Sequence, residues 1–382
     1  MRIAIAPNAF RGSLTALEAV ACITAGLERS ALAARGNLEL IPMPLADGGD
    51  GTLDILLRGL GGERIWRTVT GPDGEPVCAP FGVLGDGRTA VIEMAHASGI
   101  ELIPPARRNP LHTTTYGTGE LIGAALDRGC RHLVIGIGGS ATNDGGAGCM
   151  QALGARLTDE SGTPIPPGGG GLARLASIEA NALRQRLEGV EVTVLCDVTN
   201  PLIGPNGASH VFGPQKGADP DMVRVLDANL ARYADIIRRD LGLDVAELPG
   251  GGAAGGFGAG LVAFLGARLA PGGSTLIDLL GYEAHLARAD LVITGEGKLD
   301  AQTEGGKAVQ RIAEAATRAG VPVIAFAGKV DADADSLNGI GIRAAWSIVP
   351  GPCTLDQAIA NASDWLTAAA ITLGNTLALG SA

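Results

Sequence analysis

The sequence has few aromatic and charged residues, and its basic residues form no cluster. Aromatic side chains make up 3% and charged side chains 18% of the 382 residues, and the formal net charge is −11. Nucleic-acid binding needs a basic surface and usually aromatic stacking platforms, so this composition argues against a nucleic-acid partner. An acidic small substrate would have to be held by a few local donors.

Long hydrophobic runs and metal-type cysteine pairs are also missing. The apolar run 3–6 ends at Pro7 and is too short for a signal-peptide core. The uncharged stretches 248–267 and 365–382 are interrupted by glycines or polar residues, so neither is typical of a membrane span. The six cysteines form no CxxC pair and no zinc-site spacing, and we interpret them as reduced thiols. We therefore expect a soluble, cytoplasmic protein without a membrane partner.

Several common catalytic motifs are absent as well. The chain has no P-loop, no protein-kinase motif set and no G-x-S-x-G elbow. The five histidines form no pair at metal-ligand spacing. We interpret each of them as structural, with His96 and His112 as the two that would lie near a site.

Glycine and hydrophobic residues are abundant, with 59 glycines and 46% hydrophobic residues, which is enough for packed cores with many tight turns. Short apolar runs alternate with segments of helical periodicity, a pattern typical of an α/β fold with a mostly parallel sheet. The predicted strands are residues 3–6, 38–42, 132–136, 192–196, 291–294 and 323–327.

Three helices are indicated by the residues at their ends, and the third is ended by Gly320 and Pro322. Thr15 and Glu18 form a capping box, Asp219 and Pro220 begin a second helix, and a third helix covers residues 307–319.

Residues 64–94 follow a different pattern. Polar and apolar residues alternate there and are interrupted by GPDG at 71–74 and GDG at 85–87, which indicates antiparallel hairpins.

The length and these patterns predict two α/β domains. The first is a doubly wound, flavodoxin- or Rossmann-like parallel sheet formed by residues 1–64 with 285–382. The second is an inserted α/β domain with antiparallel strands, formed by residues 65–284. We expect the active site in the cleft between them.

A glycine-rich loop follows the predicted strand 132–136. Its sequence, GIGGSATNDGGAG at residues 136–148, is dense in backbone amides and leads into a helix, so it suits phosphate. Residues 136–141 also fit G-x-G-x-x-A, a fingerprint of dinucleotide binding that is weak on its own. The polar segment 142–145 stands where that fingerprint expects an apolar helix, so phosphate is favoured.

Two segments carry carboxylates at the ends of predicted elements. Asp197 follows the strand 192–196, where it suits a general base or a magnesium ligand; a carboxylate that caps the following turn is the alternative. Asp47 and Asp50 lie in ADGGDGT, as in oxygen-ligand loops, although either could instead cap the helix that starts near Leu53.

Three further segments combine glycine with charge or with small residues. Lys216 lies in GPQKGA, where a point charge could meet a transferring phosphoryl group; a solvated turn lysine is the alternative. GGGAAGGFGAG at residues 250–260 could bind an anion or simply allow close packing. TGEGKLD at residues 294–300 is expected on a loop after a strand, where ligand-binding residues are common.

Taken together, these motifs closely resemble those of the bacterial glycerate kinase family. The resemblance covers the chain to about residue 328 and rests on segments in the family's order: APNAFRGSL, PLADGGDGT, TTTYGTGELI, IGGSATNDGGAGCMQALGA, CDVTNPLIGPNGAS, VFGPQKGA, GGGAAGGFGAGL and DLVITGEGKLDAQT. It implies a two-domain α/β architecture, ATP with Mg²⁺ as the divalent cation, D-glycerate as the acceptor and 2-phosphoglycerate as the usual product.

The resemblance also favours particular residues for each role. Asp197 is predicted to be the base for the acceptor hydroxyl, and Lys216 to lie near the transferring phosphoryl group. The other predictions are Asn8, Arg11, Ser13 and Asn200 for the substrate; Gly138, Gly139, Ser140, Asn143, Gly255, Gly256, Glu296 and Lys298 for phosphate or nucleotide; and Asp47, Asp50 and Asp144 for the metal.

The chain departs from the family at its N-terminal motif. Where the family usually has DSFKGS, residues 8–13 are NAFRGS, so a carboxylate and a hydroxyl are lost while Arg11 keeps the positive charge. Asp50 replaces the usual glutamate, and Lys298 replaces a frequent arginine. Acceptor preference is the property that these changes put in question.

Several alternatives stay open from the sequence. A kinase of a related small hydroxy acid, or one that forms 3-phosphoglycerate, would share these motifs. A nicotinamide-dependent dehydrogenase would bind NAD and release no ADP, and a ligand-sensing protein would bind without turnover. The sequence also leaves the oligomeric state open, including a homo-oligomer.

Overall fold

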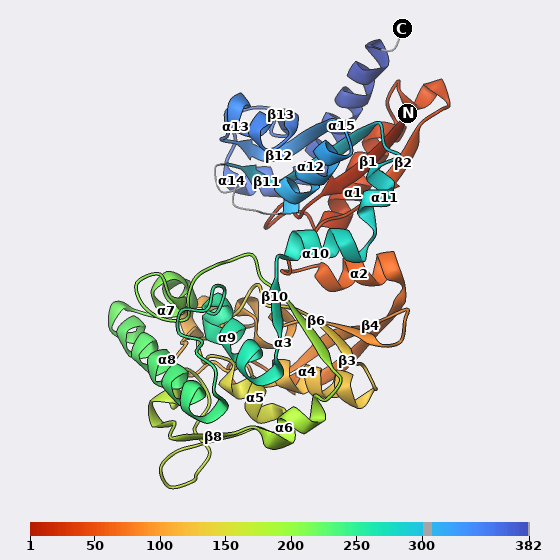
Figure 1. The fold of residues 1–382 in the computed structure, drawn as a ribbon. Coiled ribbons are helices and arrows are strands. Elements are labelled where there is room, and N and C mark those ends of the chain that lie inside the picture. The colour runs from red at the N-terminus through yellow and green to blue at the C-terminus, as the bar shows by residue number, and fades with distance from the viewer. Residues whose placement is uncertain (301–307, 381–382) are drawn as a thin grey trace. The chain divides into compact units, whose positions relative to one another are not determined.

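A computed structural model describes residues 1–300 and 308–380 of the chain (Figure 1). The chain forms two compact units: Met1–Asp47 with Gly273–Ala382, called here the discontinuous unit, and Gly48–Gly272, called the inserted unit. Both units are α/β, and the predicted fold class is confirmed.

The discontinuous unit is built on a five-stranded sheet with the order β13-β12-β11-β1-β2, and all of its strands are parallel. Numbered along this unit alone, the order is that of the flavodoxin type, with the first strand between the second and the third. The strands are β1 (Arg2–Pro7), β2 (Glu39–Pro42), β11 (Leu291–Leu299), β12 (Val323–Val330) and β13 (Ile342–Ser347).

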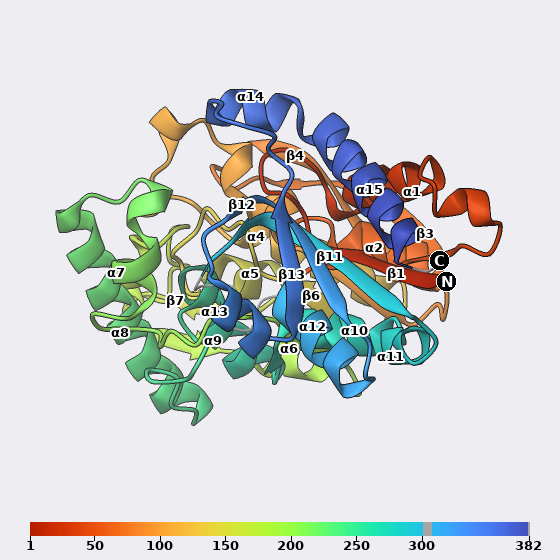
Figure 2. The ribbon, with the colours of Figure 1, turned by 90° about the horizontal axis from the view of Figure 1, so that it is seen from above.

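Helices cover both faces of this sheet. They are α1 (Ala16–Glu28), α10 (Gly272–Leu279), α11 (Tyr282–Leu286), α12 (Ala308–Arg318), α13 (Ala334–Gly339), α14 (Leu355–Ala360) and α15 (Ala362–Leu379). The alternation in β1 sorts the two cores: Ile3 and Ile5 pack with α1 and α15, whereas Ala4 and Ala6 pack with α12 on the other face. Figure 2 shows these helices on opposite sides of the sheet.

The inserted unit contains a six-stranded sheet with the order β10-β9-β6-β5-β4-β3. The pairs from β10 to β5 are parallel, and β4 pairs antiparallel with both β5 and β3, so the predicted hairpins are present. Its strands are β3 (Gly62–Thr70), β4 (Pro76–Leu84), β5 (Thr89–Glu93), β6 (His132–Gly136), β9 (Glu191–Leu195) and β10 (Arg268–Ala270), with β7 (Arg156–Thr158) and β8 (Ser177–Glu179) in a separate pair.

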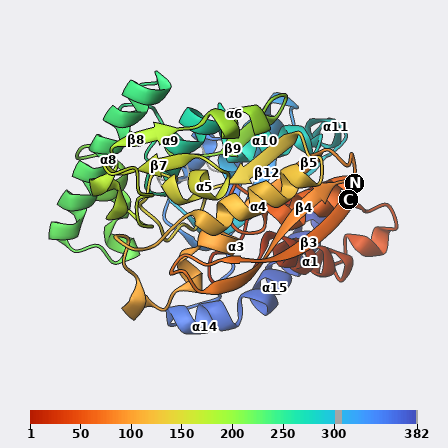
Figure 3. The ribbon, with the colours of Figure 1, turned by 90° about the horizontal axis from the view of Figure 1, so that it is seen from below.

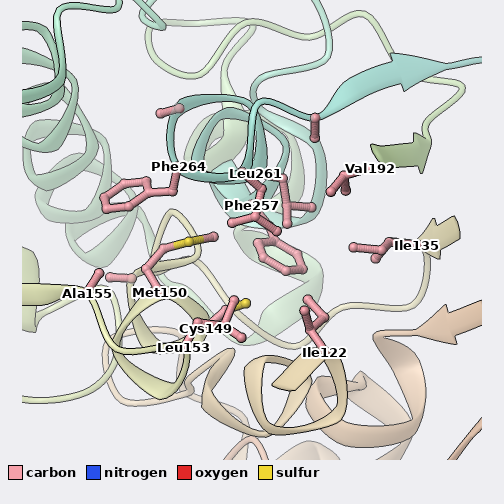
Figure 4. Close-up of a cluster of buried hydrophobic side chains, with 14 of the residues drawn as sticks. Ile122, Ile135, Cys149, Met150, Leu153, Ala155, Val192, Phe257, Leu261 and Phe264 are labelled. Atoms are coloured by element: carbon pink, nitrogen blue, oxygen red, sulfur yellow. The ribbon is translucent and has the colours of Figure 1, made fainter. Parts of the chain in front are cut away.

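The helices of the inserted unit pack around a continuous apolar core. They are α2 (Thr52–Leu60), α3 (Ala95–Ser98), α4 (Tyr116–Asp127), α5 (Ala147–Ala152), α6 (Asn181–Arg186), α7 (Ala208–Phe212), α8 (Pro220–Leu241) and α9 (Ala253–Leu265). Figure 3 shows α4 and α5 next to this sheet. In the core, Phe257 of α9 points between Met150 of α5, Ile122 of α4 and Ile135 of β6 (Figure 4).

Some elements differ from their predicted extents. β11 continues to Leu299, so most of TGEGKLD lies in a strand rather than on the predicted loop, because β12 pairs with it as far as Val330. α9 begins at Ala253, inside the glycine-rich segment. The capping box predicted for α1 and the start predicted for α8 at Asp219 and Pro220 are confirmed. Lys307, where the third predicted helix begins, and the end of the last motif lie outside the described residues.

The two units divide after Asp47 and Gly272, whereas the boundaries expected from the sequence follow residues 64 and 284. Packing explains the first difference, because Leu53 of α2 lies against Gly82 of β4 in the inserted unit. Within residues 1–300 and 308–380, no helix combines the length and hydropathy that a membrane crossing requires.

Candidate active site

Lys216 is a buried lysine that holds the glycine-rich loop after β6. Its side chain is 1% exposed, and Nζ donates hydrogen bonds to Ser140 Oγ at 2.8 Å and to the carbonyl oxygen of Thr142 at 2.7 Å. Burial lowers the pKa of the Lys216 ammonium to about 7, although the nearby Asp144 carboxylate acts in the opposite direction. The solvated turn lysine considered from the sequence is therefore not what the structure shows.

Asp144 anchors the other end of the same loop. Its Oδ2 accepts hydrogen bonds from the amide and the hydroxyl of Thr115, both at 2.9 Å, and from the amide of Gly148 at 3.3 Å. Its Oδ1 accepts from the amide of Gly146 at 3.0 Å. Burial raises the pKa of Asp144, and these hydrogen bonds oppose the rise. The carboxyl group is thus surrounded by protein donors, as expected of a residue that shapes the loop.

The middle of the loop carries two buried oxygen atoms that have no hydrogen-bond partner among residues 1–300 and 308–380, Thr142 Oγ1 and Asn143 Oδ1. The side-chain nitrogen Nδ2 of Asn143 donates to Ser209 Oγ at 2.9 Å, which fixes the side-chain direction. Since unsatisfied buried acceptors are uncommon in proteins, a donor from water or a ligand is expected at this point.

Gly255 and Gly256 allow the start of α9 to approach this loop. Both have positive φ angles, +70° and +89°. A Cβ atom at Gly255 would lie 2.0 Å from the carbonyl oxygen of Thr142, and one at Gly256 would lie 2.8 Å from Leu202 Cδ1. The structure therefore supports close packing at these two glycines, the alternative considered for this segment.

Gly138 and Gly139 lie next to the turn that precedes α2. The amide of Gly138 donates to the carbonyl oxygen of Gly48 at 3.4 Å, and a Cβ atom at Gly139 would lie 3.6 Å from Asp50 Oδ1. α5 begins only at Ala147, so the loop lacks the helix that a dinucleotide fingerprint requires directly after residue 141.

Asp197 and Asn200 lie on the segment that follows β9. Asp197 Oδ1 accepts a hydrogen bond from the amide of Gly272 at 2.8 Å, at the start of α10. Asn200 Nδ2 donates to the carbonyl oxygen of Asn206 at 2.8 Å, and the carbonyl oxygen of Asn200 accepts from Gly252 at 3.0 Å. Asn200 is therefore next to the glycine-rich start of α9.

Glu93 is a residue of this region that the sequence did not single out. It ends β5 and is 2% exposed; its Oε1 accepts the amide of Thr52 at 2.9 Å, and its Oε2 lies 3.5 Å from His96 Nε2. Burial raises the pKa of Glu93 to about 8, with a further contribution from Asp50. Burial also lowers the pKa of His96. An acid at the end of the apolar strand TAVIE was the available signal.

The N-terminal motif forms a turn after β1 in the discontinuous unit. The backbone amide of Asn8 donates to the carbonyl oxygen of Gly295 at 2.8 Å, and the side-chain Oδ1 of Asn8 accepts a hydrogen bond from the amide of Ala9 at 2.8 Å. Ser13 Oγ donates to the carbonyl oxygen of Phe10 at 2.9 Å, and Arg11 is exposed. The polar groups of Asn8 and Ser13 thus stabilise the turn that presents Arg11.

Glu296 and Lys298 lie on β11, in the same unit as this turn. Glu296 is buried, whereas Lys298 is half-exposed and forms ion pairs with Asp300 at 2.9 Å and with Asp331 at 3.2 Å. These carboxylates raise the pKa of Lys298. Its positive charge is therefore already balanced by protein groups.

The residues predicted to bind a metal are Asp47, Asp50 and Asp144. In the described parts of the chain, no three or more His, Cys, Asp or Glu side chains are placed to hold a metal ion. Mg²⁺, however, usually keeps several waters and takes one or two carboxylates together with phosphate oxygens. The exposed carboxylate of Asp50, beside Gly139, is suited to be a magnesium ligand of this kind, whereas the carboxylate of Asp144 is surrounded by protein donors. Asp47, in the discontinuous unit, stays a prediction.

These features define a class of protein: an α/β protein whose amide-rich glycine turns follow parallel strands, as in phosphate-binding folds. The chain belongs to the glycerate kinase family, because the model of that family matches residues 3–378. The resemblance stated from the motifs is thus confirmed, and membership implies a phosphotransferase.

Individual relatives agree over their full lengths. The chain is 50% identical to "Glycerate kinase" of Bacillus subtilis, covering 99% of this chain and 100% of that one. It is 46% identical to "Glycerate 2-kinase" of Escherichia coli, covering 100% and 99%. A crystal structure of a protein assigned as glycerate kinase 2 from Salmonella typhimurium matches with a TM-score of 0.87 and 50% identity, covering 100% of this chain and 99% of that one.

Proposed function

We propose that this protein transfers the γ-phosphoryl group of ATP to the 2-hydroxyl group of D-glycerate, giving 2-phosphoglycerate and ADP. The supporting observation is the full-length similarity to a protein named glycerate 2-kinase, together with a glycine loop that Lys216 holds from within the fold. The proposal places the reaction in the cytoplasm, where ATP is available.

The glycine-rich loop after β6 is the proposed binding site for the phosphates. Backbone amides of such loops bind phosphate oxygens, and Ser140 adds a hydroxyl group at 9% exposure. Lys216 would contribute mainly by fixing Ser140 and Thr142 with hydrogen bonds, which the neutral amine can also donate. The fraction of Lys216 that is protonated would add positive charge behind the loop. Phosphoryl transfer depends mainly on such positioning and charge neutralisation.

Asp197 is the proposed general base. Its carboxylate would accept the proton of the acceptor hydroxyl while that oxygen attacks the γ-phosphorus and the bond to the β-phosphate oxygen breaks. The hydrogen bond from Gly272 holds Oδ1 in place and so orients the carboxylate. Asn200, on the same segment, is proposed to bind the substrate.

Mg²⁺ would neutralise charge on the phosphates when bound, and Asp50 is the proposed protein ligand. Its exposed carboxylate lies beside Gly139, on the loop proposed for phosphate.

Arg11 is the residue proposed to bind the carboxylate of the acceptor. Its guanidinium can form two parallel hydrogen bonds with a carboxylate, and the turn formed by Asn8 and Ser13 presents it at the surface. This assignment predicts that acceptors without a carboxylate are poor substrates.

A coupled assay of ADP release tests the proposal. Purified protein with MgATP is given D-glycerate, L-glycerate, glycolate or glycerol, and ATP hydrolysis without acceptor is subtracted. We expect fast turnover with D-glycerate and little with glycerol. Faster turnover with glycolate would move the proposal to another hydroxy acid, and no acceptor-dependent ADP with any of them would refute it.

A further inference from the structure

The helix α2 begins without a cap from its own sequence. Gly51, at its N-cap, has a φ of +91° and provides no side-chain hydrogen bond, although the first amides of a helix have no partner within it. The amide of Thr52, a fully buried residue, donates to Glu93 Oε1 at 2.9 Å, although Glu93 is 41 positions away in the sequence. Its second bond, to the carbonyl oxygen of Gly49, is longer at 3.4 Å. The backbone amides of Leu53 and Gly51 also lower the pKa of this carboxyl group, against the larger rise caused by burial. A sidechain from β5 thus performs the capping.

The turn that this cap holds, residues 48–51, is packed tightly against the proposed phosphate loop. A Cβ atom at Gly136 would lie 2.5 Å from the carbonyl oxygen of Gly48, and one at Gly138 would lie 2.9 Å from the Cα atom of Gly49. Nothing larger than hydrogen fits at these two positions, so a displacement of the turn would displace the loop.

The chain on the other side of Glu93 is joined to the same loop. The amide of Met94 donates to the carbonyl oxygen of Gly136 at 2.9 Å, and the amide of Ile100 donates to that of Gly139 at 2.8 Å. Glu93 therefore lies at the end of β5, where both the turn that contains Asp50 and the phosphate loop are hydrogen-bonded to this strand end. Its 2% exposure means that it acts through these neighbours.

We propose that Glu93 is a positioning residue of the kinase, which fixes Asp50 and the phosphate loop relative to each other by capping α2 from β5. The proposal rests on the function proposed above for the loop and for Asp50. Glu93 has no contact with the reacting groups in this mechanism; its effect on rate comes from their placement, for which small displacements can cost as much as 10²-fold.

Two substitutions distinguish the loss of the capping acceptor oxygen of Glu93 from the loss of its ionisable carboxyl group. Glu93→Gln keeps an acceptor oxygen at the same reach, whereas Glu93→Ala removes it. We expect Glu93→Ala to lower kcat by about tenfold or more and to raise the KM for MgATP, and Glu93→Gln to stay within about threefold of the wild type. Leu126→Ala is the matched control, because it removes buried volume from α4 in the same unit without touching the turn.

Hydrogen exchange measures how well the amides of this turn are protected, independently of activity. In the full chain without ligands, we expect the amides of Thr52 and Leu53 to exchange about tenfold faster in Glu93→Ala than in the wild type or Glu93→Gln. Leu126→Ala should lower the melting temperature but leave this exchange and the kinetics near the wild-type values. If Glu93→Ala does not fold, Glu93→Asp, which is one methylene shorter, takes its place with the same expectations.

Equal exchange and kinetics in the wild type and Glu93→Ala would overturn the proposal, as would a Glu93→Gln variant that is as impaired as Glu93→Ala. Failure of the proposed function has a different signature: wild-type protein without acceptor-dependent ADP release, whatever the exchange data show.

Discussion

Replacement of Lys216 by methionine tests how the fold tolerates a buried amine. Lys216→Met keeps most of the side-chain volume and removes the group that donates to Ser140 and Thr142. The pKa of Lys216 is lowered from 10.5 to about 7 in the folded protein. Between these values the unfolded chain holds a proton that the folded protein has released, so the stability contributed by this site rises with pH.

The size of the effect follows from that window. Each pH unit between about 7 and 10 should add about 1 kcal/mol to the free energy of unfolding of the wild type, and none of this pH dependence remains in Lys216→Met. From pH 7 to pH 9 the gap in melting temperature between the two proteins should therefore change by roughly 5 °C in favour of the wild type.

Melting curves of both proteins at pH 7, 8 and 9 provide the assay. Lys329→Met is the control, because that lysine is 67% exposed and should show no such trend. A gap between wild type and Lys216→Met that stays constant with pH would refute the reasoning, since it would mean that the buried amine remains charged. The loss of the two hydrogen bonds to the loop should also lower kcat, by up to about 10²-fold.

Three further predictions concern carboxyl groups. Asp197→Asn should lower kcat by about 10² or more in the ADP-release assay while the melting temperature stays within a few degrees of the wild type. Folding raises the pKa of Glu93 from 4.5 to about 8. The stability that Glu93 contributes is therefore greatest at low pH and is lost as pH rises through 8. The melting temperature of Glu93→Gln should rise relative to that of the wild type between about pH 6 and 9. Asp144→Ala leaves buried donors without an acceptor and should cost about 3 kcal/mol or more in denaturant unfolding.

The fold could be predicted from local patterns. The IAIA alternation of β1, the capping box at Thr15 and the GPDG turn each correspond to an element of the structure. Local residues determine such features, because strand alternation, helix caps and hairpin turns depend on neighbours in sequence. The longer extent of β11 was missed because pairing with β12, not the glycine-rich sequence GEGK, decides it.

Of the candidate site, only the motifs could be predicted from the sequence. The loop at 136–148 and Lys216 could be recognised, but their hydrogen bonds join residues 76 and 74 positions apart, which no local pattern contains. Glu93 could not be predicted for the same reason. Its partner, Thr52, belongs to another motif, and its carboxyl group ends an otherwise largely apolar strand. Tertiary contacts, rather than local propensities, determine where these side chains lie.

Phosphorus NMR of the reaction mixture tests the central proposal most directly. With MgATP and D-glycerate, we expect the γ-phosphate signal of ATP to decline while a phosphomonoester signal grows that couples to a single proton, as a phosphate on the 2-position must. A signal coupled to two methylene protons would show transfer to the 3-position, and growth of inorganic phosphate alone would contradict a kinase acting on glycerate.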